Sequence, residues 1–585
     1  MKYSDQISSW LVESGYTHCF YVGGGNIMHL IESLNNVLDC RPVIHEVAAG
    51  IATEYFNETS DSGKALALVT AGPGLTNIVT AIAGAYLESR ELLVIGGQVK
   101  TANLSYGKLR QNGIQEIDGV KISNPICNKS ICMDKIWSKE EFIQTINYSN
   151  NGRKGPIFLE IPLDIQAKEV DFPKSKVGLI SNINKISESD LRVIINKLRL
   201  SERPVLMLGG GISRKTAANI NKLLKETSIP IVTTWNAMDR IGADHPNYVG
   251  RPNTWGQRSA NIVLQQADLL VALGTRLGLQ QTGFNWQEFI PLGEIIQVDI
   301  DSDEIEKEHP KVDIGFSVDA NDLLQRLLTH NLGKHDKWLD FCRLVRGKIP
   351  LIEEGVNVTI PQYVSPHKFV KTLSDLTCGE DIIIPCSSGS AYTIMMQVFE
   401  QKLGQKIVTN KGLASMGYGL SGAIGASIAN PDKRVILVEG DGGFAQNIQE
   451  IGTAAINNCN LKIFIFDDNG YASIRMTQSS YFDGNYVGCD RATGLGLPDW
   501  EVLFQAWAVK VIRIDADVYK NKSYLADLEG EGLVVFIVTI NPKQTYFPKI
   551  SSKISESGSM ISSPLHLMTP ELPENIKNQV FKIKI

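Results

Sequence analysis

Acidic residues follow an apolar segment in the C-terminal third of the chain. The segment VILVEGDGG has the character of a buried strand, and it ends in Gly440, Asp441, Gly442 and Gly443 shortly before a helical pattern begins. Ligands of open parallel sheets bind where strands end, and the free N–H groups at a helix start attract phosphate. An aspartate at such a place repels phosphate unless a cation lies between them. We therefore interpret Asp441 as a ligand of Mg2+ that bridges a diphosphate.

A second acidic strand end follows the first. The segment LKIFIFDDN ends in Asp467, Asp468, Asn469, Gly470 and Tyr471. If the two strands are neighbours, this end delivers further oxygen ligands to the same edge of the sheet. A tight turn with a capping aspartate explains the first motif when it is taken alone. The two motifs together favour a metal-bound diphosphate.

Apolar strand-like runs alternate with amphipathic helical runs along most of the chain. This alternation predicts an α/β protein with three doubly wound parallel-sheet domains. We place the domains at residues 1–175, 188–345 and 360–545, with a polar linker between the first two. Residues 546–585 have no helical or strand period and are predicted to be a tail that drapes over another surface.

Composition excludes several classes of protein. The 585 residues are 43% hydrophobic and 21% charged, which is ordinary for globular proteins and unlike collagen, coiled coils or disordered chains. A net charge of -6 without a basic run argues against nucleic acid as a partner. Neither a membrane-spanning apolar run nor a signal peptide is found, so we expect a cytoplasmic protein without a membrane partner. Nine scattered cysteines signal no disulfide framework and no zinc site.

The paired strand-end motifs resemble those of the thiamine diphosphate (ThDP) enzymes, and the resemblance extends over essentially the whole chain. It is strongest to the acetohydroxyacid (acetolactate) synthase branch. The resemblance implies that Asp441, the side chain of Asp468 and the carbonyl of Gly470 hold Mg2+. The glycines of the first motif and Tyr471 would then bind the cofactor. The pair Asp467-Asp468 departs from the usual amides of the family and adds negative charge.

Glu46 is the expected acid–base residue of a pyrimidine-binding first domain. It stands in PVIHEVAAG, where a strand meets a helix. A glutamate that favours the helix dipole is the alternative interpretation. In the family that the chain resembles, the corresponding glutamate protonates the aminopyrimidine ring of ThDP, which requires a dry site.

The same resemblance assigns three further segments to the ThDP site. Gly72 and Pro73 of AGPGLTN, followed by Asn77, would lie beside the pyrimidine edge, although the segment is also a plain proline turn. Gln115 matches an active-site glutamine, and Ile114 replaces the phenylalanine that is usual before it. We therefore expect Gln115 near the substrate.

Met416 and Ala414 are the corresponding candidates in the diphosphate-binding third domain. The segment KGLASMGYGLSG resembles the family segment whose bulky apolar side chain bends the cofactor into a V shape, a role that falls on Met416. The backbone carbonyl of Ala414 would accept a hydrogen from the cofactor's amino group. Filling a gap in the core is the alternative for a methionine. Family members assemble this site between two chains, so we expect a homodimer or homotetramer.

The central domain resembles the FAD-binding domain of the same synthases. Gly209, Gly210 and Arg276 are candidates to bind the flavin diphosphate. Glycine-rich turns are also plain loops, and several relatives keep this domain without a flavin.

Three further residues bear on the substrate. The synthases grip the carboxylate of a second 2-oxoacid with an arginine just before Thr282-Gly283, and this chain has Gln280 there. The segment after the metal ligands lacks the expected tryptophan and brings Arg475 and Gln478 toward the pocket. For Arg475, a surface position is the alternative.

These features predict a ThDP- and Mg2+-dependent carboligase. It would decarboxylate a 2-oxoacid such as pyruvate and transfer the two-carbon unit to an acceptor carbonyl, such as the keto group of a nucleotide-linked deoxysugar. Acetolactate synthesis and simple decarboxylation are the alternatives within the family. A catalytically idle nucleotide-binding or regulatory relative is the alternative outside catalysis.

Overall fold

Three six-stranded sheets form the framework of the computed structural model, which describes residues 1–173, 175, 177–178, 183–554 and 560–583. The prediction of three parallel α/β domains is therefore confirmed. The chain divides into two compact units. The first combines residues 1–182, 381–389 and 408–539, and the second combines 183–380, 390–407 and 540–585.

The first sheet belongs to the first unit and has the strand order β2-β1-β3-β4-β6-β5, with every pair parallel. Its inner strands are continuous apolar runs because helices cover both faces. The strands are β1 (Tyr16–Tyr21), β2 (Asp39–Pro42), β3 (Lys64–Val69), β4 (Leu92–Gln98), β5 (Lys129–Cys132) and β6 (Pro156–Pro162). The helices α3 (Glu46–Thr59) and α4 (Pro73–Leu87) each begin soon after a strand ends.

Another sheet contributes five parallel strands to the same unit, in the order β13-β15-β16-β18-β17. Their bounds are Ile382–Ile384, Val435–Gly440, Leu461–Asp467, Val534–Thr539 and Lys510–Ile514, in that order. Between β13 and β15 the chain forms α17 (Tyr418–Ala429), which is buried along most of its length.

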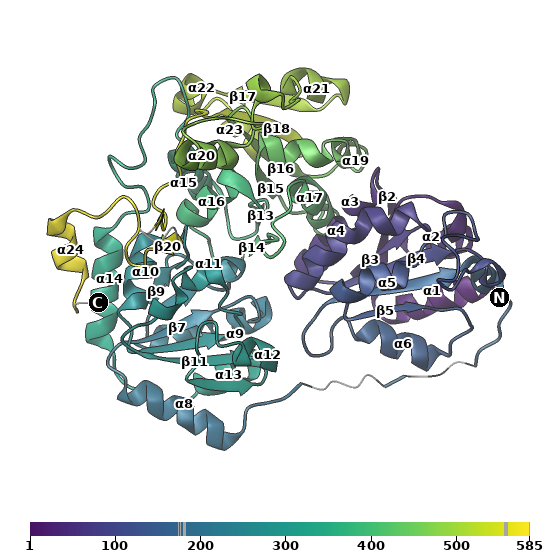
Figure 1. Cartoon of the computed structure of the whole chain (residues 1–585), viewed down its shortest axis with the longest axis horizontal. Coiled ribbons are helices and arrows are strands. Elements are labelled where there is room, and N and C mark those ends of the chain that lie inside the picture. Colours follow the sequence, from purple (N-terminus) through teal and green to yellow (C-terminus); the bar gives the residue numbers. More distant parts are fainter. Residues whose placement is uncertain (174, 176, 179–182, 555–559, 584–585) are drawn as a thin grey trace. The chain divides into compact units, whose positions relative to one another are not determined.

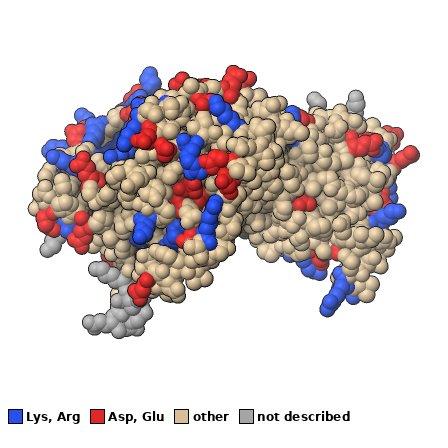
Figure 2. All heavy atoms as spheres, turned by 90° about the horizontal axis from the view of Figure 1, so that it is seen from above, with Lys and Arg blue, Asp and Glu red and all other residues tan. Residues whose placement is uncertain are grey.

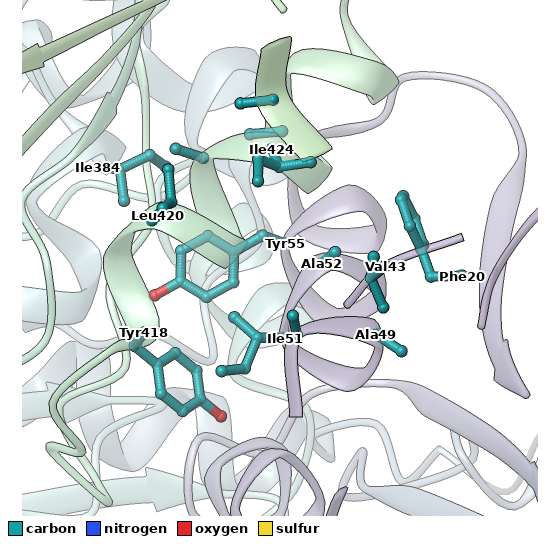
Figure 3. Packing of buried hydrophobic residues seen from close by; sticks show 14 of the residues in the cluster. Phe20, Val43, Ala49, Ile51, Ala52, Tyr55, Ile384, Tyr418, Leu420 and Ile424 are labelled. Atoms are coloured by element: carbon teal, nitrogen blue, oxygen red, sulfur yellow. The ribbon is translucent and has the colours of Figure 1, made fainter. Parts of the chain in front are cut away.

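Helix α17 packs directly against α3 (Figure 1). The approach is close because α17 has glycines where the helices meet: a Cβ at Gly425 would lie 2.1 Å from the carbonyl oxygen of Ala52, and one at Gly422 would lie 2.6 Å from the ring of Tyr55. Figure 3 shows Tyr55 and Tyr418 projecting into this contact. The packing joins the first and third predicted domains into one apolar core.

A buried polar network strengthens the same contact. Glu54 of α3 is fully buried and accepts hydrogen bonds from Arg90 at 2.6 Å, Asn410 at 3.1 Å and Tyr418 at 3.0 Å. Arg90 also donates to the carbonyl of Thr409 at 2.7 Å. Because a buried carboxylate is tolerated only when it is paired and hydrogen-bonded, this network favours a single arrangement of the two sheets.

The second unit contains the central sheet, with parallel strands in the order β12-β11-β10-β7-β8-β9. Their bounds are Ile314–Ser317, Glu294–Asp299, Leu269–Leu273, Pro204–Leu208, Ile231–Thr233 and Tyr248–Gly250, in that order. Helix α14 (Asp336–Lys348) lies in the stretch that follows this sheet in the sequence, and it buries Trp338.

The C-terminal tail is more regular than its sequence predicts. It contains α24 (Glu574–Val580) and an antiparallel pair, β19 (Ser552–Ile554) with β20 (Met560–Ser562). Tertiary contacts hold the tail in place, and such contacts leave no periodic pattern in the sequence. The Gln266 side chain donates a hydrogen bond to the carbonyl of Val580 and accepts one from the N–H of Lys582. Apolar tail residues join the core of the second unit, namely Ile550, Leu565, Met568 and Val580.

Surface charge and helix hydropathy are both unexceptional. On the face drawn in Figure 2, acidic and basic side chains are interspersed. Among the helices of the described ranges, none combines the length and the apolar character that crossing a bilayer requires.

Candidate active site

The two acidic strand ends lie next to each other, as the sequence predicts. Strands β15 and β16 are parallel neighbours, and Gly440 pairs with Phe466 in register. The short helix α18 (Asp441–Phe444) begins at the end of β15. Asp441 accepts hydrogen bonds from the N–H of Gly442 at 2.7 Å and from the N–H of Gly470 at 2.8 Å. One carboxylate therefore links both strand ends.

The oxygen atoms at this edge suit a hard divalent cation. Asp441 is fully buried and Asp468 is 2% exposed. Burial raises the pKa of Asp441 well above its usual value, and the charges of Asp468 and Asp467 raise it further. A cation between the carboxylates would relieve both effects, and two carboxylates with the Gly470 carbonyl are the donor types that Mg2+ prefers. Over the described ranges, no group of three or more His, Cys, Asp and Glu side chains forms a competing metal site.

The other charged residues of this segment are engaged within the fold. Asp467 pairs with Arg513 of β17 at 2.9 Å. Arg475 of α20 (Ala472–Tyr481) is 6% exposed and pairs with Asp468 at 3.0 Å. The Gln478 side chain bonds to the N–H and carbonyl of Val487. The structure thus gives Arg475 and Gln478 hydrogen-bond partners within the protein.

The glycines of the first motif differ in their surroundings. A Cβ added at Gly442 would lie 2.4 Å from the ring of Tyr471, so that ring covers the turn. A Cβ at Gly443 would lie 3.1 Å from a carboxylate oxygen of Glu439. At Gly440, no described heavy atom would lie within 4 Å of the Cβ. The backbone is therefore approachable by a ligand at Gly440.

Glu46 is the first residue of α3 and is 7% exposed. His45 caps the helix, because its Nδ1 accepts a hydrogen bond from the N–H of Val47 at 3.2 Å. The Nδ2 of Asn77, on α4, donates to a carboxylate oxygen of Glu46 at 2.9 Å. The structure thus brings together Glu46 and Asn77, which the sequence predicts separately as site residues, and it holds the Glu46 carboxylate in a nearly dry position. Such a group can donate or accept a proton at a ligand beside it.

Gly72 and Gln115 also lie together. Gly72 has a φ of 67°, and a Cβ there would lie 2.4 Å from the carbonyl oxygen of Gln115. Pro73 is the first residue of α4, where its missing N–H costs no hydrogen bond. Gln115 has a φ of 62° and an exposed side chain. The turn therefore requires glycine at position 72 to accept the loop that carries Gln115.

A cavity of about 360 Å3 lies where helices and loops of the first and third predicted domains meet within the first unit. Met416, which is 36% exposed, faces it, and Asn77 lines it from α4. Ala414, two residues earlier, has a φ of 56°, a strained conformation for alanine. The cavity is lined by Ile44, His45, Val47, Ile51, Asn77, Thr80, Ser415, Met416, Gln446, Asn447 and Gln449. Both sides come from one chain here, and the predicted assembly between two chains stays a prediction.

Glu450 is a site residue that the sequence did not reveal. It begins α19 (Glu450–Ile456), is fully buried, and accepts hydrogen bonds from the N–H groups of Ile44 at 3.2 Å and His45 at 3.0 Å. Burial raises its pKa, and its hydrogen bonds oppose that rise. It therefore holds the loop that presents Glu46. An acidic residue at a helix start has no distinguishing pattern, so the signal lies only in the tertiary contact.

Replacing Glu450 with alanine should leave the N–H groups of Ile44 and His45 unsatisfied. We expect a loss of about 1–3 kcal/mol in the free energy of unfolding, measured with denaturant. We also expect kcat to fall more than KM rises, because Glu46 loses its fixed position. The Glu450→Gln variant keeps an acceptor oxygen and should be much closer to the unmodified protein. Equal behaviour of the alanine variant and the unmodified protein would remove Glu450 from the site.

The flavin candidates lie at strand ends of the central sheet. A Cβ at Gly209 would lie 2.1 Å from the carbonyl oxygen of Gly274, so close backbone packing alone explains this glycine. At Gly210 the nearest atom would be 3.6 Å away. Arg276 is exposed, and its backbone carbonyl accepts a hydrogen bond from the Lys307 ammonium. Gln280, on α11 (Leu279–Thr282), is also exposed.

Family models match all three sheet regions. The N-terminal thiamine pyrophosphate-binding domain of the thiamine pyrophosphate enzymes matches residues 1–122, the central domain matches 191–327, and the C-terminal thiamine pyrophosphate-binding domain matches 387–538. The matches to the first and third domains contain the residues on both sides of the cavity, and they also contain Glu46 and Asp441.

Individual relatives give a consistent result. A probable acetolactate synthase large subunit from Methanocaldococcus jannaschii is 30% identical over 565 residues, which cover 93% of this chain and 93% of the relative. A probable acetolactate synthase large subunit from Methanococcus aeolicus is 30% identical over 499 residues, 81% of this chain and 80% of the relative. The acetolactate synthase isozyme 1 large subunit of Escherichia coli is 28% identical over 554 residues, 93% of this chain and 95% of the relative.

Proposed function

Because the chain belongs to the thiamine diphosphate-dependent enzymes and is related to the acetolactate synthases, we propose that it is a carboligase with an acceptor other than a second 2-oxoacid. The donor would be a 2-oxoacid such as pyruvate. The acceptor would be a carbonyl compound, in our proposal the keto group of a nucleotide-linked deoxysugar. Membership of this enzyme family leaves no support for a catalytically idle relative.

In this proposal, Glu46 is the acid–base residue and Asn77 is its positioning residue. Bound ThDP supplies the thiazolium that accepts the electrons of decarboxylation. The Glu46 carboxylate would hold or give up a proton beside the pyrimidine ring, and Asn77 orients that carboxylate through the 2.9 Å hydrogen bond. Met416 and the neighbouring cavity residues exclude water and fix the conformation of the coenzyme.

The diphosphate would be held through Mg2+ at the two strand ends. Asp441, Asp468 and the carbonyl of Gly470 are the proposed ligands, and the open backbone at Gly440 would admit the phosphate oxygens. The hydrogen bond between Asp441 and the N–H of Gly470 supports this assignment, because it keeps the two ligand segments in contact.

Gln280 is the observation that carries the choice of acceptor. The related synthases grip the carboxylate of their second 2-oxoacid with an arginine at this place. A neutral amide cannot supply the charge-assisted, bidentate contact that a guanidinium gives. The exposed side chain of Gln280 could instead contact the hydroxyl groups of a sugar.

A product assay tests this proposal. The purified protein with ThDP and Mg2+ would be given labelled pyruvate alone, or pyruvate with a nucleotide-linked 4-keto-deoxysugar, and the products would be separated by mass spectrometry. We expect a branched sugar carrying two additional carbons, and little acetolactate or acetaldehyde. Steady formation of acetolactate from pyruvate alone would contradict the proposed acceptor and favour acetolactate synthesis.

We also propose a flavin in the central domain and a homodimer or homotetramer as the working assembly. The sequence resemblance of the central domain to the FAD-binding domain of the synthases supports the flavin, whereas the packing of Gly209 against Gly274 gives that glycine a purely structural reason. Visible absorption of the purified protein tests the flavin directly.

A further inference from the structure

The guanidinium of Arg475 is buried against the strand end that carries Asp468. Its Nη2 donates to the Asp468 carboxylate at 3.0 Å and to the Asp468 carbonyl at 2.5 Å. Its Nη1 donates to the carbonyls of Asn469 at 3.1 Å and Cys489 at 3.3 Å. One side chain thus fixes both the carboxylate of Asp468 and the backbone on either side of it.

The charge of the Asp468–Arg475 ion pair accounts for the aspartate at position 468. Asp441 and Asp468 are two carboxylates at one buried edge, where the family resemblance predicts one carboxylate and one amide. A second carboxylate in such a place is costly unless a cation offsets it. The ion pair of Asp468 with Arg475 has no net charge, and an amide has none either. The pair therefore has the same formal charge as the residue that it replaces.

We propose that Asp468 and Arg475 act as one unit that presents a charge-compensated oxygen ligand to the divalent cation, with Arg475 as its positioning residue. This inference rests on the proposed metal–diphosphate site. It assigns Arg475 a task for which a substrate contact is unnecessary, and it explains why an aspartate is accepted at position 468.

The geometry permits both contacts at once. A carboxylate has two oxygens with about four lone-pair sites, so one oxygen can accept from a guanidinium while the other binds a metal. Arg475 is the fourth residue of α20, and its side chain reaches back to the Asp468 carboxylate at the strand end. Its contacts with three carbonyls limit rotation of the Asp468 backbone.

Removing the two charges of this pair one after the other tests the proposal. Replacing Asp468 alone with asparagine would remove the carboxylate charge that offsets the Arg475 cation beside the metal. We expect Mn2+ binding to weaken at least about tenfold. Adding Arg475→Gln removes that cation and keeps an amide donor for the carbonyls. The double variant should then recover Mn2+ affinity to within about twofold of the unmodified protein.

Mn2+ binding would be measured by the loss of the free-ion signal in electron paramagnetic resonance, with the full-length protein and added ThDP. The matched control is the pair Asp381→Asn with Arg434→Gln, which makes the same two charge changes directly before β13 and β15 begin, at the opposite edge of the sheet from the proposed ligands. These control substitutions should leave Mn2+ affinity unchanged. Circular dichroism would confirm that every variant is folded.

The outcomes separate this proposal from the proposed function. If the unmodified protein fails to bind Mn2+ with ThDP, the proposed function is wrong and this inference falls with it. If the unmodified protein binds Mn2+ but the double variant is no better than Asp468→Asn alone, Arg475 only ties the loop together and the inference is wrong. Recovery in the double variant supports it.

Discussion

Replacing Glu46 with glutamine should lower the rate of 2-oxoacid decarboxylation by about 100- to 10,000-fold, the usual contribution of a positioned acid–base group. The amide keeps the size of the side chain and can still meet Asn77, but it cannot hold an exchangeable carboxyl proton. The Kd for ThDP, measured by quenching of tryptophan fluorescence, should stay close to that of the unmodified protein. Together, these results would place Glu46 in the chemical step.

Glu58→Gln is the matched control for this substitution. Glu58 lies at the opposite end of α3, and its carboxylate is 4.0 Å from Arg90. The same chemical change should leave decarboxylation close to that of the unmodified protein. If Glu46→Gln were equally active, the acid–base role would have to move to another group, and the pairing of Glu46 with Asn77 would be structural.

Asp441→Asn should weaken binding of Mg2+ and ThDP by at least about 100-fold, more than is typical for a residue that only supports a metal ligand. The substitution removes the charge of a metal ligand. The amide nitrogen of the new asparagine would also face one of the two N–H groups that now donate hydrogen bonds to Asp441. Isothermal titration of Mg2+ and ThDP into the purified variant measures the loss.

The same variant has a distinctive effect on stability. Burial raises the pKa of Asp441, so its ionised form is disfavoured in the metal-free protein. The relief of this burial cost opposes the loss of one hydrogen bond to a buried N–H group, so we expect the metal-free Tm of Asp441→Asn to stay close to that of the unmodified protein. The rise in Tm on adding Mg2+ and ThDP should disappear. A variant that keeps that rise would show that the coenzyme binds elsewhere.

Much of the site was predictable because its residues stand at the ends of buried strands. The runs that form β15 and β16 are apolar, and both end in Gly and Asp. Parallel neighbours must bring such ends to one edge. Likewise, Glu46 and Asn77 each occur just after a strand, at or near a helix start, where side chains of one sheet converge. These positions follow from local patterns and from the strand order of an open sheet.

The remaining contacts depend on residues far apart in the sequence. Glu450 bonds to Ile44 and His45, which are more than 400 positions away, and local periodicity carries no trace of that contact. The sequence places Arg475 toward the pocket or, alternatively, at the surface. The structure pairs it with Asp468, a carboxylate of the protein itself. The tail is likewise held by a distant residue, because Gln266 donates a hydrogen bond to the carbonyl of Val580.

The central claim is that one cavity binds ThDP, with Mg2+ on the two strand ends and Glu46 at the pyrimidine. A crystal structure of the protein grown with ThDP and Mn2+ tests this most directly, because anomalous scattering locates the metal. We predict an anomalous peak coordinated by Asp441, Asp468 and the Gly470 carbonyl, with the Glu46 carboxylate in hydrogen-bond contact with the pyrimidine ring. A metal bound elsewhere, or a pyrimidine out of reach of Glu46, would contradict the account.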